Sequence, residues 1–409
     1  MTTFKLFSNL FGVNCLSFNC FPRIGNLSTL SGFRFYSNQL AKRPFDFDED
    51  EQSFPCHVPI MCNELVELFN PQDGQLFIDM TFGSGGHSKA LLASGKDIKI
   101  IGMDRDPLAY KYAHRLAEKT NGQVIPLLAK FSQLPGLLDK HGIQKGSIQG
   151  IIMDLGASAM QMADPSRGFS FNSEGPLDMR MDGKYCNVSI TADDVINSLD
   201  VKDLTKIFKI YGCEKLAAKY ANAIIDCRVM MKRISSTIEL ANLIDSLASG
   251  HVIEDVERDR TSATRVFQGL RIFVNNELNE LNYGLKKMRD YLFRDDKVTQ
   301  LYKNNLDNMK AIKDEIRAST SGKLAVISYN RLEDTLTKRH LQGTDIDNPL
   351  THQPPQLFNS RLHKPTDQQM ERIVFKKWFS LSKIASSQQE IEQKSLTYPA
   401  KLRVAIRVL

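Results

Sequence analysis

A glycine-rich turn between two apolar runs constrains this 409-residue chain more than any other feature. The turn, Asp79–His87, follows the apolar run 75–78 and precedes a helix-like segment over 88–93. A second apolar run over 98–103 ends at Asp104. Glycine lets the backbone turn sharply and lets a ligand approach the main chain closely, and a helix that starts there points free N–H groups at the ligand. The pattern predicts a strand, a turn, a helix and a second strand around a nucleotide-type cofactor.

Asp104 stands nineteen residues after Gly85, where a carboxylate at a strand tip can accept hydrogen bonds from both hydroxyls of a ribose. The dinucleotide pattern G-x-G-x-x-G fits only in part, because Gly83 and Gly85 match its first two glycines and Ser88 stands at the third. This mismatch disfavours a dinucleotide oxidoreductase. An ordinary tight turn is the alternative for a glycine motif alone, and the placement between two strands favours the cofactor pocket.

Apolar runs of strand length repeat at spacings of about 22–27 residues, which is typical of βαβ units and predicts an α/β fold with a parallel sheet. These runs cover 76–80, 98–103, 124–128 and 148–154. Residues 160–265 then have the pattern of a loop followed by helices, and we expect one helix over 263–288 to lead back into the sheet. The charged stretch 293–317 is expected to form a solvated surface helix or loop. Strand patterns return at 323–329, 378–384 and 402–409.

The first 44 residues carry five basic residues and no acidic one, and they are rich in Phe, Leu, Ser and Asn. This composition is typical of a mitochondrial transit peptide, with a disordered tail of accidental composition as the alternative. We expect a transit peptide over 1–36, a location in the mitochondrial matrix and a disordered acidic linker over 37–56. The rest of the chain has 48 basic and 47 acidic residues, so binding of nucleic acid would need a local patch.

The seven cysteines include no C-x-x-C pair, so the sequence predicts neither a metal site nor a disulfide framework. No later segment has the length and apolar character of a membrane span.

Several further motifs occur in order along the chain. Asp79–His87 has the form D-x-T-x-G-x-G-G-H. It is followed by D-R-D-P at 104–107, D-L-G at 154–156, R-G-F-S-F at 167–171, G-P-L-D-M-R-M-D at 175–182 and L-E-D at 332–334. Together these motifs resemble the small-subunit ribosomal RNA cytosine-N4 methyltransferases of the MraW family, over roughly residues 55–409.

The resemblance implies an α/β class I S-adenosylmethionine-dependent methyltransferase fold with an inserted helical domain that helps hold RNA. The methyltransferase domain would cover 57–160 and 263–409, and the helical insertion 161–262. With the N-terminal segment, the resemblance implies the mitochondrial branch of the family, which methylates a cytidine of 12S rRNA and supports ribosome assembly and translation. The expected partners are that rRNA, the pre-ribosomal small subunit and an assembly-factor protein, with no membrane.

The family's cofactor residues carry over onto the strand tips and the glycine turn. They are Gly85, Gly86, His87, Asp104, Phe131, Asp154 and Gln161. Phe131 would offer an apolar face where a flat base lies, with plain core packing as the alternative.

The exocyclic amine of cytosine is a poor nucleophile because its lone pair is delocalised into the ring. Catalysis then needs alignment of the reacting atoms and hydrogen-bond acceptors on the N–H groups. Asp154 and Ser158 are the candidates to bind the amine, and Asn330 is a third candidate catalytic residue. For Asp154, a role in cofactor binding alone is an equal alternative.

The segment 167–182 interleaves arginines with aromatic residues, a pattern that suits phosphate and base contacts. Its candidate RNA contacts are Arg167, Phe169, Asp178, Arg180 and Asp182. The alternative is a structured loop in which Arg180 and Asp182 pair with each other.

Departures from the family pattern spare the cofactor motifs. Thr261 and Asn330 stand where the family has histidine, and residues 394–399 lack two of its arginines. Asn330 can hydrogen-bond a base but cannot accept a proton near neutral pH as histidine can. These changes keep a second hypothesis open, a ribosome-assembly factor that binds RNA with little or no catalysis, whereas the intact Asp79–His87 and Asp104 favour the enzyme.

Overall fold

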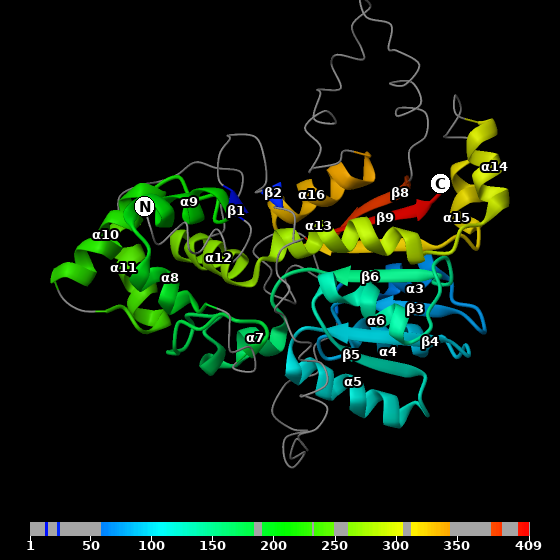
Figure 1. The fold of residues 1–409 in the computed structure, drawn as a ribbon, viewed down its shortest axis with the longest axis horizontal. Coiled ribbons are helices and arrows are strands. Elements are labelled where there is room, and N and C mark those ends of the chain that lie inside the picture. Colours follow the sequence, from blue (N-terminus) through cyan, green and yellow to red (C-terminus); the bar gives the residue numbers. More distant parts are fainter. Residues whose placement is uncertain are drawn as a thin grey trace, which may run out of the picture.

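The computed structural model describes residues 13–14, 23–24, 59–183, 190–230, 233–248, 261–305, 312–343, 378–386 and 400–408. The expected transit peptide and acidic linker lie outside these residues, except for the short strands β1 (Val13–Asn14) and β2 (Arg23–Ile24). Figure 1 shows a twisted sheet with helices on both faces, beside a lobe built from helices.

Seven strands form the central sheet in the order β5-β4-β3-β6-β7-β9-β8. Neighbouring strands pair in parallel except at β9, which runs antiparallel to both β7 and β8. The seven apolar runs identified in the sequence are all strands, with ends within two residues of those expected. Their bounds are β3 Leu76–Asp79, β4 Lys99–Asp104, β5 Val124–Leu128, β6 Gly150–Asp154, β7 Lys323–Ser328, β8 Trp378–Ala385 and β9 Lys401–Arg407.

Successive side chains of a strand point to opposite faces of the sheet, so each face has its own core. Ile78, Ile101 and Met153 belong to one apolar cluster, whereas Phe77 and Ile100 belong to another. The first cluster includes apolar residues of α6 (Leu134–Lys140), α13 (Glu277–Met288) and α16 (Arg331–Leu341). The second includes residues of α3 (Cys62–Phe69), α4 (Gly86–Leu92), α14 (Asp296–Asn304) and α15 (Lys313–Ala318). Helix α5 (Pro107–Lys119) packs on β4 and β5.

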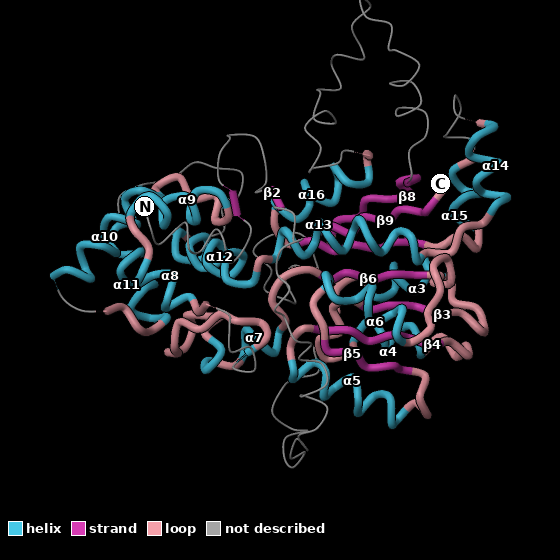
Figure 2. The backbone as a smooth tube through the Cα atoms, viewed as in Figure 1, coloured by secondary structure: helices cyan, strands magenta, loops and turns pink. Residues whose placement is uncertain are grey.

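Helices alone form the lobe on the left of Figure 1, as the helix colouring of Figure 2 shows for the described part of 190–275. They are α8 Ala192–Ser198, α9 Val201–Ile210, α10 Ala217–Met230, α11 Thr237–Ala248 and α12 Ser262–Asn275. Their buried apolar residues belong to the same cluster as the first face of the sheet, so the lobe and the sheet share one core. The short helix α7 (Ala159–Ala163) and the 3-10 turn Pro165–Arg167 lead from β6 toward the lobe.

The structure corrects two expectations about the second half of the chain. The single helix expected over 263–288 is two helices, α12 and α13, because Asn276 between them adopts a left-handed conformation with φ 53°. The stretch 293–317 is not simply solvated. Val298 and Tyr302 of α14 and Ile316 of α15 are buried in the second core. Charged residues surround these apolar positions in the sequence and hide their helical spacing.

Candidate active site

A cavity of about 740 Å³ opens where the carboxyl ends of β3, β4 and β6 meet the loops that follow them. In Figure 1 these ends face the helical lobe. This is the edge where ligands bind in open α/β sheets, and pockets for small ligands typically measure about 300–1,000 Å³. Of the candidate site residues, the cavity is lined by Gly86, His87, Asp104, Phe131, Asp154, Ser158 and Gln161.

The turn after β3 needs glycine at two adjacent positions for different reasons. Gly85 has φ 80°, and a Cβ there would lie 2.7 Å from the Phe82 ring. A Cβ on Gly86 would lie 2.6 Å from the ring of Pro59. Gly85 is not among the cavity-lining residues, so it shapes the turn, whereas Gly86 lines the cavity directly.

Asp104 ties the tip of β4 to the glycine turn. Its Oδ2 accepts a hydrogen bond from the backbone N–H of Gly83 at 2.8 Å, and its Oδ1 accepts one from the N–H of Asp106 at 2.9 Å. Burial raises the pKa of Asp104 to about 7, although both hydrogen bonds act in the opposite direction. The carboxyl group is thereby fixed at the cavity wall.

His87 is the centre of a charged cluster behind the turn. Its Nε2 lies 3.4 Å from Asp154 Oδ2, and its Nδ1 lies 3.6 Å from the sulfur of Cys62. The carboxylate of Asp79 is buried and accepts hydrogen bonds from Ser88 Oγ at 2.8 Å and from the Thr81 N–H at 3.2 Å. Burial opposes a charge on His87, but the contacts with Asp154 and Cys62 and the charges of Asp154 and Asp79 raise its pKa to about 10.

The raised pKa of His87 predicts that stability of the ligand-free protein falls as pH rises from about 6.5 to about 10. In this window the folded state keeps the proton that the unfolded chain releases, so folding is favoured at the lower pH. A tenfold change in proton affinity is about 1.4 kcal/mol, and the window spans about three such changes, so we expect a loss of about 4 kcal/mol. Urea unfolding at pH 6.5, 8 and 9.5 measures it, with His87→Gln as the control. An equal fall in both proteins would contradict the assignment.

Phe131 begins a 3-10 turn after β5 (Phe131–Gln133) and lines the cavity. Its ring also packs against α13, because a Cβ on Gly284 would lie 3.3 Å from it. The cofactor and packing roles considered for this residue are therefore both compatible with its position.

The tip of β6, the loop after it and α7 present Asp154, Ser158 and Gln161, respectively, to the cavity. Asp154 Oδ1 is buried and has no hydrogen-bond partner among the described residues. Ser158 caps α7, where its Oγ accepts from the N–H of Gln161 at 3.2 Å, and Gln161 Oε1 accepts from the N–H of Ser158 at 3.0 Å. The Gln161 amide also donates to Asp106 Oδ2 at 2.9 Å. Ser158 and Gln161 therefore hold in place the loop that follows Asp154.

The structure places Asn330 at a helix cap, and its expected catalytic role stays a prediction. Its Oδ1 accepts hydrogen bonds from the N–H groups of Leu332 and Glu333, both at 3.0 Å, and it is not among the cavity-lining residues. Asn330 is the N-cap of α16, and Thr261 is likewise the N-cap of α12, through a 3.2 Å bond to the N–H of Thr264. Thr and Asn are favoured at this position. The two departures from the family's histidines therefore fall on helix caps.

Replacing Asn330 by alanine is expected to lower the free energy of unfolding by about 1 kcal/mol, the usual cost of losing an N-cap side chain. Asn330→Ser keeps a capping oxygen and is expected to cost only a few tenths of that value. Urea denaturation of the two variants and the parent compares them. Equal losses for alanine and serine would contradict the capping role.

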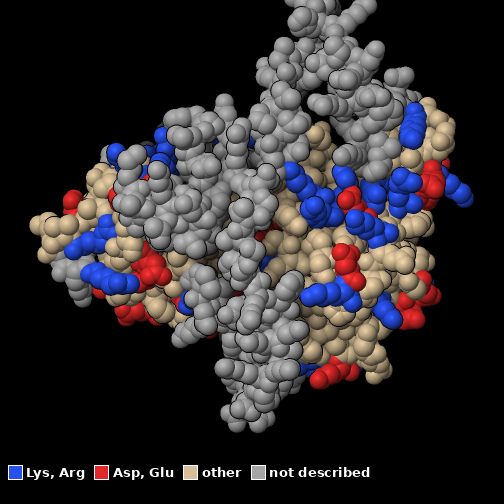
Figure 3. Space-filling model, in the orientation of Figure 1, with Lys and Arg blue, Asp and Glu red and all other residues tan. Residues whose placement is uncertain are grey.

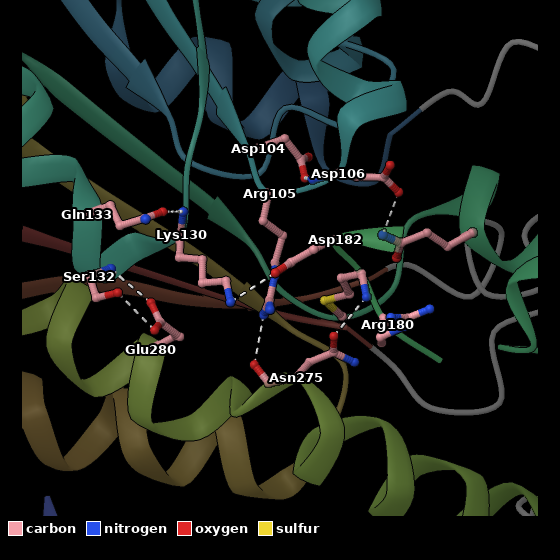
Figure 4. A network of polar contacts seen from close by, with 12 residues as sticks. Asp104, Arg105, Asp106, Lys130, Ser132, Gln133, Arg180, Asp182, Asn275 and Glu280 are labelled. Atoms are coloured by element: carbon pink, nitrogen blue, oxygen red, sulfur yellow. Dashed lines mark hydrogen bonds and ion pairs between the residues drawn. The ribbon is translucent and has the colours of Figure 1, made fainter. Parts of the chain in front are cut away.

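None of the five candidate RNA contacts in 167–182 lines the cavity. Phe169 is 6% exposed, Arg167 pairs with Asp106 at 2.9 Å, and Arg180 pairs with Asp178 at 2.7 Å. Figure 4 shows Asp182 between Arg105 and Lys130, with both of which it forms ion pairs. From the sequence, Arg180 and Asp182 are considered as partners of each other. In the structure Arg180 pairs with Asp178, and Asp182 pairs with Arg105 and Lys130. These side chains of segment 167–182 form contacts within the protein. Their role in RNA contact stays a prediction.

Several residues at this site escaped the sequence reasoning. Arg105 donates to Asp182 and, at 2.7 Å, to the carbonyl of Asn275 on α12 (Figure 4). Glu333 reaches the cavity from α16, and α13 contributes Glu277 and Glu280. In the sequence, only the L-E-D motif at 332–334 draws attention to Glu333. That motif does not indicate that the carboxylate of Glu333 lies at the cavity.

Among the described residues no cluster of side chains could hold a metal ion. No helix in that part of the chain is long and apolar enough to cross a membrane.

Comparison with known sequences gives relatives of several kinds. The chain is 38% identical to "12S rRNA N(4)-cytidine methyltransferase METTL15" of Homo sapiens over 86% of this chain and 83% of that one. It is 33% identical to "Ribosomal RNA small subunit methyltransferase H" of Anaplasma phagocytophilum, over 77% and 93%. It also matches "Putative receptor-type tyrosine-protein phosphatase mosPTP-1" of Culex quinquefasciatus with 38% identity, but spans only 22% of that longer chain.

Residues 54–320 match the MraW methylase family, a span that includes the helical lobe and all the cavity-lining residues except Tyr329 and Glu333. The parallel sheet with one antiparallel strand, and the glycine turn at its carboxyl edge, fit the α/β class I S-adenosylmethionine-dependent methyltransferase fold expected from the sequence. The chain belongs to the MraW methylase family of S-adenosylmethionine-dependent methyltransferases.

Proposed function

We propose that the protein methylates N4 of a cytidine in mitochondrial 12S rRNA, with S-adenosylmethionine as the methyl donor, and thereby supports assembly and translation by the mitochondrial ribosome. The observation that carries the proposal is one cavity in which the glycine turn, Asp104 and Asp154 meet. The printed activity of the human relative supports the choice of base and RNA. The composition of residues 1–36 supports a location in the mitochondrial matrix.

The residues present fit the proposed cofactor. Gly86 lets Pro59 pack closely against the turn, because a Cβ there would lie 2.6 Å from the Pro59 ring. Asp104 is held by two backbone N–H groups where it would bind ribose hydroxyls. Phe131 would pack against the adenine. S-adenosylmethionine, when bound, supplies a methyl group already activated on a sulfonium. Acidic groups at the cavity wall also favour its positive charges.

The protein's contribution is then to align the amine and to accept its hydrogen bonds. Asp154 stands at the tip of β6, fixed by His87 and by the bond from its own N–H to Thr81 Oγ1 at 2.7 Å. Ser158 and Gln161 hold the following loop in place through their reciprocal cap. We assign amine binding to Asp154 with Ser158 beside it, and positioning of the loop to Gln161.

Binding of RNA would rest on local positive charge. Figure 3 shows Lys and Arg side chains gathered over the α13 and α16 side of the sheet domain. The basic residues in the last turns of these helices include Lys286, Lys287, Lys338 and Arg339. We propose that this basic surface and the helical insertion over 161–262 hold the rRNA or the pre-ribosomal small subunit, with an assembly-factor protein as a further partner. Contacts with phosphates would make the affinity fall with salt.

The test is transfer of labelled methyl to small-subunit rRNA, offered free and as pre-ribosomal particles. The proposal expects label in the RNA with the parent protein. Binding of S-adenosylmethionine without transfer to either form would instead support an assembly factor that keeps the fold without the activity.

A further inference from the structure

Glu333 is a further carboxylate in the cavity, and it comes from α16 instead of from the strand tips. It is 2% exposed. Its Oε2 accepts a hydrogen bond from the N–H of Tyr329 at 3.2 Å, whereas its Oε1 has no hydrogen-bond partner among the described residues. The nearest cation is Arg271 on α12, at 3.7 Å from Oε1, but Arg271 donates two hydrogen bonds to Glu277, at 2.9 and 3.1 Å.

Asp154 and Glu333 each have a buried oxygen without a hydrogen-bond partner in the described part of the chain, and both line the cavity. Buried side-chain atoms without a hydrogen-bond partner occur on several described residues, yet only these two residues also line the cavity. A buried acceptor without a donor costs about 1–3 kcal/mol, so such a pair at one cavity indicates donors supplied by a ligand.

The backbone brings the two carboxylates to neighbouring walls. Gly156, two residues after Asp154, has φ 102°, and a Cβ there would lie 3.7 Å from Arg271 and 3.9 Å from the Tyr329 ring. The N–H of Leu155 donates to the carbonyl of Ile327 at 3.0 Å, which fixes the loop after β6 against the end of β7. Tyr329 therefore lies beside the loop that follows Asp154 and donates its N–H to Glu333.

An exocyclic amine carries two N–H donors, which matches two acceptors without donors. Acceptors on both N–H groups localise the nitrogen lone pair for attack, and one of them must take a proton when the new N–C bond forms. Asp154 is already paired with His87. Burial, opposed by Arg271 and assisted by Glu277, raises the pKa of Glu333 to about 7, near the value that suits a general base.

We propose that Glu333 binds the exocyclic amine of the target base through Oε1 and accepts its proton, while Asp154 Oδ1 holds the second N–H. The nitrogen lone pair forms the bond to the methyl carbon, and the bond from that carbon to sulfur breaks with its electron pair moving to sulfur. The N–H electron pair returns to nitrogen, and the proton passes to Glu333 and then to water. This inference rests on the proposed function, because it requires an amine-bearing base in the cavity.

The experiment measures single-turnover methyl transfer to small-subunit rRNA by the full chain between pH 5.5 and 8.5. S-adenosylmethionine is kept saturating at every pH, because the pKa of Asp104 is also raised to about 7. The parent rate is expected to rise tenfold per pH unit below about 7 and then to level. Glu333→Gln is expected to be about 10²–10⁴-fold slower and independent of pH, with cofactor affinity within about twofold of the parent by calorimetry. Glu315→Gln, an exposed change on α15, is the matched control.

Each result separates this inference from the proposed function. No transfer by the parent protein overturns the proposed function itself. Transfer by the parent, with Glu333→Gln equal to it in rate and pH profile, overturns the role of Glu333 alone. A loss of cofactor affinity equal to the loss of rate also overturns it, since Glu333 would then act on the cofactor. If Glu333→Gln does not fold, the pH profiles of the methyl-transfer rate in the parent and in Glu333→Asp test the proposal instead. A rate that is independent of pH in both proteins contradicts it.

Discussion

Replacing Asp104 by alanine is expected to weaken binding of S-adenosylmethionine at least 100-fold and to abolish methyl transfer. The change removes the proposed acceptor for the ribose hydroxyls, and each hydrogen bond to a charged group contributes about 1.5–3 kcal/mol. It also leaves the N–H groups of Gly83 and Asp106 without their acceptor, so the glycine turn loses its tie to β4. Calorimetric titration with the cofactor measures the effect.

Two further variants make the Asp104 result interpretable. Asp104→Asn keeps one acceptor oxygen and is expected to bind with intermediate affinity. Asp97→Ala removes an exposed carboxylate just before the opposite end of β4 and is expected to bind as the parent does. Parent-like affinity in Asp104→Ala would show that the cofactor lies elsewhere.

Replacing Asp182 by alanine is expected to lower the free energy of unfolding by about 3–5 kcal/mol, because it leaves the largely buried Arg105 without its carboxylate. Asp182 also pairs with Lys130 at 2.9 Å. The positive charges beside it hold the pKa of its carboxyl group below the ordinary value, although burial opposes this effect. Through Arg105, which bonds the carbonyl of Asn275, the network joins β4, segment 167–182 and α12 (Figure 4).

The control for Asp182→Ala removes the carboxylate of an exposed ion pair. Asp296 pairs with Arg294 at 3.2 Å with its side chain 85% exposed, and Asp296→Ala is expected to cost less than about 0.5 kcal/mol. Urea denaturation at pH 7 compares both variants with the parent. Similar losses in the two would contradict a structural role for the buried network.

The sequence predicted the sheet well because its signals are local. Each buried parallel strand is a short apolar run, and the glycine turn is required by backbone conformation and close packing at Gly85 and Gly86. The break between α12 and α13 escaped prediction because asparagine occurs inside helices as well as in the left-handed conformation that Asn276 adopts.

The polar contacts of the site could not be predicted because they join distant positions. Arg105 meets Asp182 and Asn275, which lie 77 and 170 residues away. Arginines beside aromatic residues give the same pattern whether their partner is a phosphate or a carboxylate of the same chain. Segment 167–182 shows the second case for Arg167 and Arg180, whose partners are Asp106 and Asp178.

Two of the departures from the family pattern, Thr261 and Asn330, are explained by their roles as helix N-caps and give little support to a protein without catalytic activity. Thr261 and Asn330 begin helices and do not line the cavity. Residues 394–399 lie outside the described residues. The cavity meanwhile contains carboxylates from β4, β6, α13 and α16, and the proposed amine acceptors Asp154 and Glu333 are among them.

The identity of the methylated nucleoside tests the central claim most directly. Small-subunit rRNA is incubated with the parent protein and S-adenosylmethionine, digested to nucleosides and separated by liquid chromatography with mass spectrometry. The account predicts N4-methylcytidine with the parent and none with Asp104→Ala. Methyl groups on another base, on another position of cytidine, or equally in both proteins would contradict it.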